Sequence, residues 1–149
     1  MSSALATIAA KLRTFDQDVE RIIIDLARGY EDVIIEWNVE AQLYDQGIRG
    51  DGKPIVPQYS ARTKQRKREK GQPSDRVTLR DTGAFHRSFR IDWRETEFEI
   101  MATNYKAPFL AKRYTPHIFG LTEDHLEVLR GLLLQDLRQR LNDLLHGNE

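Results

Sequence analysis

Apolar residues recur three or four positions apart from Ala4 to Leu43, which is the spacing of helices with one buried face. Gly29 interrupts this pattern, and no proline occurs in the segment. Because glycine weakens a helix interior, the segment predicts either one long helix weakened at Gly29 or two helices joined there. Gly47 is placed to end it. The apolar positions are Leu12, Phe15, Val19, Ile22, Ile23, Leu26, Val33, Ile34, Trp37 and Leu43.

The pattern changes to strict alternation from Phe85 onward. Apolar residues occupy odd positions up to Trp93 and then even positions from Phe98 to Ala102. This period of two is typical of half-buried strands, and Arg94 to Glu97 would connect them as a hairpin loop. Two strands are marginal alone, so we expect them to pack on helices.

A second helical seam ends the chain. Thr122 is placed to cap a helix that runs to about Leu145, and a shorter helical segment spans Tyr105 to Tyr114. The apolar seams at both ends exceed what a two-stranded hairpin can cover, which leaves area for contact between subunits. The predicted class is therefore α+β, in one domain over residues 1–149, and the seam consists of Leu126, Leu129, Leu133, Leu137, Leu141 and Leu144.

The middle of the chain is polar. Ser60 can cap a short helix from Ala61 to Lys70, and Gly71 can terminate it. That helix has almost no apolar face, so we expect packing to hold it only loosely. The pattern predicts a mobile basic arm at about residues 60–76, with its most mobile part from Lys64 to Asp75.

The charges are segregated although they sum to zero over the 149 residues. Residues 1–52 hold five basic and ten acidic side chains, whereas residues 62–90 hold ten basic and three acidic ones. Residues 91–149 are again acidic, with seven basic and ten acidic side chains. Such asymmetry indicates a charged partner or complementary packing between copies.

Composition and motifs argue against catalysis. The absence of cysteine excludes disulfides, thiol nucleophiles and cysteine-ligated metal. The chain has no GxSxG elbow, phosphate-binding P-loop or HExxH helix, and its four histidines lack metal-ligand spacing. His125 is expected to be an exposed residue at the start of the last helix. We therefore expect neither an enzyme nor a cofactor or metal site. No apolar run approaches the ~20 residues of a membrane span, so no membrane partner is expected.

The densest charge run lies in the predicted central helix. Its basic residues could contact nucleic-acid phosphates, dock on an acidic protein, or form an ordinary solvated helix face. The aromatic side chains that would support base stacking are missing between Tyr59 and Phe85. The candidate partner- or DNA-contacting residues are Arg62, Lys64, Arg66, Lys67, Arg68 and Lys70.

A turn follows this run, in the segment from Thr78 to Phe89. In Asp81-Thr82-Gly83 an Asx side chain can accept backbone N–H groups and glycine permits a positive φ. Leu79 and Phe85 would anchor the two sides in the core, and we interpret the segment as a structural turn.

Read in order, these segments resemble a known family. Gly47-Ile-Arg-Gly-Asp-Gly-Lys-Pro-Ile-Val-Pro57 is followed by Tyr59-Ser60 with Thr63 and a basic helix, and then by Leu79-Arg-Asp81-Thr82-Gly83-Ala-Phe85 with Ser88. This order is similar to that of virion morphogenesis and tail-completion proteins of tailed bacteriophages, closest to the Bacteroides-phage type. The resemblance covers roughly residues 40–121. Phe85 stands where many relatives have leucine, and the basic helix is unusually dense.

The resemblance implies a non-enzymatic structural protein of the virion neck or tail, assembled in the host cytoplasm. It implies a ring of copies that contacts neighbouring neck or tail proteins, with packaged DNA as a further contact of the basic arm. The family has no catalytic or cofactor residues to carry over. The alternative function is a nucleic-acid-binding module that uses residues 62–70.

Overall fold

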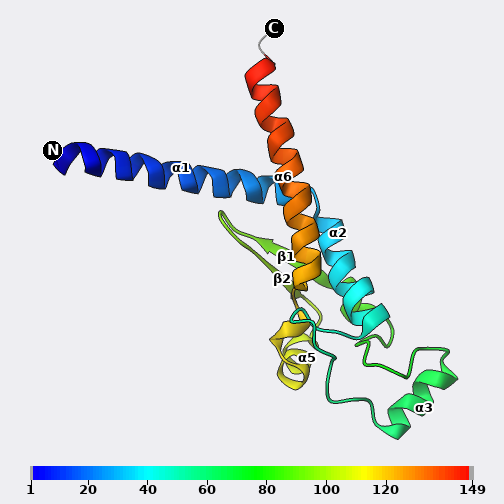
Figure 1. Cartoon of the computed structure of the whole chain (residues 1–149). Helices are drawn as coiled ribbons and strands as arrows, with labels where there is room; N and C mark the ends of the chain where they lie inside the picture. Colours follow the sequence, from blue (N-terminus) through cyan, green and yellow to red (C-terminus); the bar gives the residue numbers. More distant parts are fainter. Residues whose placement is uncertain (1, 148–149) are drawn as a thin grey trace.

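The computed structural model describes residues 2–147. Two long helices project from a small α+β body, α1 (Ser2–Arg28) and α6 (Glu123–His146) (Figure 1). The expected α+β class is confirmed. Between the long helices lie α2 (Glu31–Glu36), η1 (Trp37–Gln46), α3 (Ala61–Glu69), α4 (Ala84–Arg87), β1 (Phe89–Trp93), β2 (Phe98–Ala102), α5 (Ala107–Tyr114) and η2 (Pro116–Ile118).

The N-terminal segment is two helical pieces, not one. α1 ends at Arg28, and the chain turns at Gly29 and Tyr30 before α2 begins. α2 continues without a break into η1, which is wound as a π-helix and ends at Gly47 with a φ of 64°. The second of the two predicted alternatives is therefore the correct one, and the predicted end at Gly47 is confirmed.

The predicted hairpin is present. β1 and β2 pair antiparallel, with Ile91 opposite Ile100, and residues 94–97 form the connection. The expectation that alternation begins at Phe85 was wrong, because Phe85 lies in α4. A single helical turn also places Phe85 and Phe89 on the same side, four residues apart, and their rings meet edge to face at 5.2 Å.

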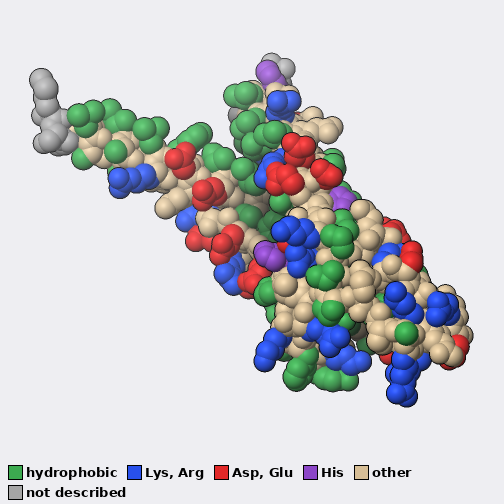
Figure 2. All heavy atoms as spheres, turned by 60° about the horizontal axis from the view of Figure 1, so that its bottom comes forward, with side chains coloured by type: hydrophobic (Ala, Val, Ile, Leu, Met, Phe, Trp, Pro, Cys, Tyr) green, Lys and Arg blue, Asp and Glu red, His purple; other side chains and the backbone are tan. Residues whose placement is uncertain are grey.

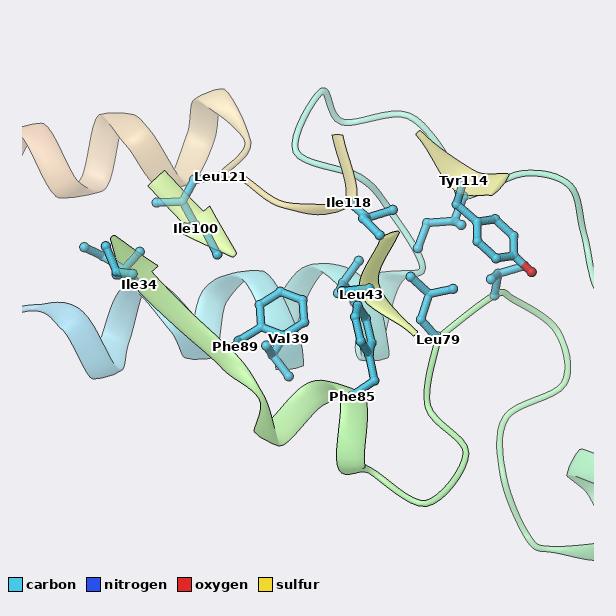
Figure 3. Close-up of a cluster of buried hydrophobic side chains, with 14 of the residues drawn as sticks. Ile34, Val39, Leu43, Leu79, Phe85, Phe89, Ile100, Tyr114, Ile118 and Leu121 are labelled. Carbon is cyan, nitrogen blue, oxygen red and sulfur yellow. The ribbon is translucent and has the colours of Figure 1, made fainter. Parts of the chain in front are cut away.

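The core lies where η1, the hairpin and the segments around them converge. Figure 3 shows side chains from all of these elements pointing toward one another. Fully buried members come from α2, η1, β1, η2 and the loops before α3 and α4, so this small centre holds the body together. They include Ile34, Leu43, Ile55, Val77, Phe89 and Ile118.

Two buried amides of η1 fasten the segment that leads into α6. Asn38 donates to the carbonyl of Ile118 at 3.0 Å and accepts from the N–H of Gly120 at 2.9 Å. Gln42 donates to the carbonyl of Gly120 at 2.8 Å and accepts from the N–H of Thr122 at 2.9 Å. Thr122 in turn caps α6 through a bond from the His125 N–H, as predicted.

Away from this body, the two long helices carry exposed apolar side chains. Leu5, Leu12 and Phe15 of α1 are 60–69% exposed, and Leu144 and Leu145 of α6 are 69% and 75% exposed. The turn after α1 is held to the middle of α6, since Tyr30 donates to the carboxylate of Asp136 at 2.5 Å. That bond is the main reason the pKa of Tyr30 is raised. On the projecting parts, these apolar side chains remain mostly exposed within the described chain.

Candidate interaction surface

The basic helix α3 begins as the sequence predicted. The Ser60 hydroxyl accepts from the N–H of Thr63, and Gly71 follows the helix with a φ of 67°. Three of its cationic side chains, Arg62, Arg66 and Arg68, are exposed, and Lys64 is partly exposed. None of these four forms an ion pair with any carboxylate between residues 2 and 147.

Lys67 is different, because it points inward. The side chain is 7% exposed, and its Nζ donates to the carbonyl of Arg80 at 2.6 Å and to Gln72 at 3.4 Å. The same Nζ lies 4.9 Å from the centre of the Tyr59 ring, within range for a cation–π contact. Lys67 was expected to meet a partner or DNA, and this was wrong because the protein itself satisfies the ammonium group.

The contacts of Lys67 also show how α3 is held although it lacks an apolar face. Lys67 joins α3 to the segment that follows Thr78, and Lys70 adds a salt bridge of 2.7 Å to Asp81. The hydrogen bond from Lys70 is the main cause of the lowered pKa of Asp81. The sequence predicted only loose packing for this helix, and the contacts that hold it in the structure are polar ones made by Lys67 and Lys70. Mobility of the arm stays a prediction.

The turn at residues 81–83 forms, but by a different device. The Asp81 carboxylate accepts from Lys70 and not from the backbone of its own turn. The Thr82 hydroxyl accepts from the N–H of Ala84, and Gly83 adopts a φ of 85°. The predicted left-handed glycine is confirmed, and the predicted Asx role of Asp81 was wrong because Thr82 takes it.

The remaining residues of the turn motif face inward. Leu79 is buried with a φ of 55°, and Phe85 is buried in the core. Ser88 accepts from the N–H of Asn104 at 3.1 Å and donates to the carbonyl of Phe85 at 2.8 Å, so it ties α4 to the segment after the hairpin. Their role in the structure is to hold the turn, as the structural interpretation predicted.

Tyr59 joins the two halves of the family-like motif. Its hydroxyl accepts from the N–H groups of Thr78 and Leu79 at 3.0 and 3.2 Å. Residues 59–70 and 78–88 thus form one unit across an intervening loop. The Gly47–Pro57 segment lies against another part of the body, where the N–H of Gly50 donates to the carbonyl of His117 at 2.7 Å.

Between α3, the turn and the start of α5 lies a cavity of about 520 Å³, which we call the basic groove. This volume is in the range of small ligand sites, roughly 300–1,000 Å³. Leu79, Phe85, Leu110 and Tyr114 give it apolar surface. Five cations and one carboxylate line it, namely Arg66, Lys67, Lys70, Arg80, Lys106 and Asp81. Figure 2 shows lysine and arginine side chains gathered at this end of the molecule.

Tyr105 and Lys106 belong to this groove and did not stand out in the sequence. They lie 35 or more residues beyond the basic helix, in a segment without a charge run. Tyr105 is 76% exposed, which is unusual for a large aromatic side chain. An aromatic–lysine pair immediately before a short helix was the one available signal, and it is a weak one.

Two histidines lie in unexpected surroundings. His86 is 5% exposed, with its Nε2 at 2.9 Å from the Thr78 carbonyl, and its buried Nδ1 has no hydrogen-bond partner among the described residues. Burial lowers the pKa of His86 to about 4.

His125 stacks on Trp37 at 5.1 Å and donates from Nδ1 to Gln42, so its expected exposure was wrong.

No group of three histidine or acidic side chains that could hold a metal ion occurs between residues 2 and 147. No helix in that range is long and apolar enough to cross a bilayer. No protein-family model, curated protein sequence or solved structure matches the chain.

Proposed function

We propose that the chain is a non-enzymatic structural protein of a bacteriophage neck or tail, whose copies associate in a ring and connect virion components. The observation that carries the proposal is the pair of projecting helices with unpartnered apolar side chains. Leu12 at 60% and Leu144 at 69% exposure would each be stabilised by a neighbouring subunit. Exposed apolar helices on a small body are typical of proteins that bury this surface against other subunits.

The order of the family-like motifs gives further support. Tyr59, Thr78 and Leu79 meet through one hydroxyl group, so the motif halves form a folded unit and are not unrelated fragments. The charge segregation also fits contact between copies, since the basic end formed by α3 lies opposite the projecting part of α1 (Figures 1 and 2).

Sedimentation velocity over a range of protein concentrations, with negative-stain microscopy of the largest species, tests this function. We expect closed rings of uniform diameter at micromolar concentration. A chain that stays monomeric at about 100 µM would contradict the proposal, because the exposed apolar helices would then have another purpose. Portal, capsid or tail-tube genes beside its gene would be the expected genomic setting.

The alternative function, nucleic-acid binding through α3, rests on a separate observation. Arg62, Arg66 and Arg68 are exposed without carboxylate partners in the described chain, so they can approach phosphates. Binding of a 20-base-pair duplex, measured at 50 and 200 mM salt, distinguishes the two functions. Micromolar affinity with a steep salt dependence that Arg62→Ala/Arg68→Ala abolishes would favour the alternative.

A further inference from the structure

The basic groove has unneutralised charge next to apolar surface. Arg66 and Lys106 line it, and neither forms an ion pair within residues 2–147. Its one carboxylate, Asp81, is already bonded to Lys70. A fitting occupant therefore carries carboxylates beside an apolar side chain that reaches Leu79 and Phe85.

The projecting part of α1, residues 4–20, ends in a segment of that chemistry. Phe15 is 64% exposed and is followed by three acidic residues within five positions. At about 100° per residue, Asp16 lies at one edge of the apolar stripe, Glu20 lies on the same side but farther from the stripe, and Asp18 lies on the other side. Asp16 and Glu20 form no ion pair with the described basic residues, whereas Asp18 pairs with Arg21 at 3.3 Å.

The two surfaces cannot meet within one chain. α1 leaves the body on the side opposite α3, and side chains of α3 line the groove (Figure 1). Figure 2 shows many lysine and arginine side chains at one end of the molecule, whereas apolar and acidic side chains, with a few basic ones, lie along α1 at the other end. A second copy can bring the two together.

We propose that α1 of one copy docks in the basic groove of the next, with Phe15 against the apolar surface and Asp16 and Glu20 beside Arg66 and Lys106. This contact deepens the proposed function and rests on it, since it names the surfaces through which copies associate. It is heterologous: each copy offers one α1 and one groove, so copies add head to tail until a ring closes.

Two charge-reversed variants test the contact. Arg66→Glu/Lys106→Glu alters only the groove, and Asp16→Lys/Glu20→Lys alters only α1. We expect each to raise the protein concentration at which half of the chain is assembled by about 10-fold or more, because opposed charges become like charges. Sedimentation velocity measures this concentration, and an unchanged circular dichroism spectrum shows that the fold is retained.

Matched controls lie on the same helices. Arg62→Glu is one turn from Arg66 on α3 but does not line the groove. Asp25→Lys lies on α1, away from the stripe, and its side chain is exposed. We expect both controls to assemble at the same concentration as the unaltered chain.

Mixing the two assembly-deficient variants gives the sharpest result. The groove variant retains an intact α1 and the α1 variant retains an intact groove, so that contact can form, and the reversed groove and the reversed α1 also carry opposite charges. We therefore expect the mixture to regain assembly, whereas each separate sample stays monomeric.

Three outcomes would overturn the contact. If the unaltered chain forms rings and both charge-reversed variants do so at the same concentration, the docking is wrong while the proposed function stands. If the unaltered chain stays monomeric, the proposed function fails and the contact fails with it. If Arg66→Glu/Lys106→Glu assembles normally but loses duplex DNA binding, the groove is a nucleic-acid site and the docking is wrong.

Discussion

The body and the projecting helices of this protein differ in how well their side chains are satisfied within the chain. In the body even the buried amides of Asn38 and Gln42 have donors and acceptors in place. On α1 and α6 the apolar side chains of Leu5 and Leu145 remain 69% and 75% exposed. The difference is that these buried polar groups of the body find their partners within the chain, whereas the two helices leave apolar side chains exposed, as the proposed association of copies requires.

This contrast also appears within a single helix. Lys67 of α3 is buried and satisfied by the Arg80 carbonyl, whereas Arg66 and Arg68 on either side are exposed. The inward residue belongs to the body, and the outward ones are available to a partner. A run of like charges can therefore combine a structural residue with interaction residues.

The largest stability effect is expected in the body, at Asn38. Asn38→Ala leaves the carbonyl of Ile118 and the N–H of Gly120 buried without their partner. We expect the free energy of unfolding to fall by about 3 kcal/mol, measured by urea denaturation. Gln135→Ala on the exposed surface of α6 is the control and should change it by less than about 0.5 kcal/mol. An equally small change for Asn38→Ala would show that the body is not fastened by this amide.

Acid should weaken the body through His86. The folded pKa is about 4, below the ordinary value of 6.5, so the unfolded chain binds the proton first as pH falls. Stability from this group is complete above pH 6.5 and is lost between pH 6.5 and 4, with a loss of about 2 kcal/mol at pH 5.

Urea denaturation at pH 7.5 and pH 5 measures the effect. His86→Gln, which has no imidazole to protonate, should lose less stability on acidification than the unaltered chain by about that amount. His117→Gln is the exposed control and should keep the full dependence. An identical pH dependence for His86→Gln and the unaltered chain would contradict the assignment.

The turn at Gly83 should show a similar or smaller effect. Its φ of 85° is a conformation that β-branched residues resist, so Gly83→Val should lower the free energy of unfolding by about 1–3 kcal/mol. Gly131 of α6 has open space around an added Cβ, and Gly131→Ala should stabilise that helix by up to about 1 kcal/mol. Thermal unfolding compares the two, and an unchanged melting temperature for Gly83→Val would refute the role of the turn.

The smallest stability effect is expected on the projecting helices. Leu12→Ser removes an apolar side chain that is already 60% exposed, so the free energy of unfolding of the monomer should change by less than about 0.5 kcal/mol. Assembly should weaken instead, as measured by sedimentation. A substantial loss of monomer stability would show that Leu12 packs within its own chain, and the comparison between body and helices would fail.

Local patterns predicted most of the elements. Helix ends with a short-range cause, such as Ser60, Thr122 and Gly47, lie where capping chemistry placed them. The hairpin was also predictable, apart from its first strand, where Phe85 belongs to a helical turn. Periodicity could not separate one helical turn from alternation over so few residues.

The polar contacts of the candidate surface were harder to predict. Nothing local distinguishes Lys67 from its basic neighbours, because its partners Tyr59 and Arg80 lie outside its helix and meet it only in the folded chain. Lys106 joins the same groove from beyond the hairpin. The charge run therefore predicted the side of the basic groove that α3 forms, whereas the residues of its other sides come together only in the folded chain.

Because α1 is long, a small change of its angle at the Gly29 turn moves its far end by a large distance. At 1.5 Å per residue the helix is about 40 Å long, so a change of about 5° at its base moves its tip by about 3–4 Å. The Tyr30–Asp136 hydrogen bond lies beside this turn and helps to fix the angle between α1 and the body. In the proposed ring that angle would set the curvature from one copy to the next, so the bond between Tyr30 and Asp136 would influence how many copies complete the circle.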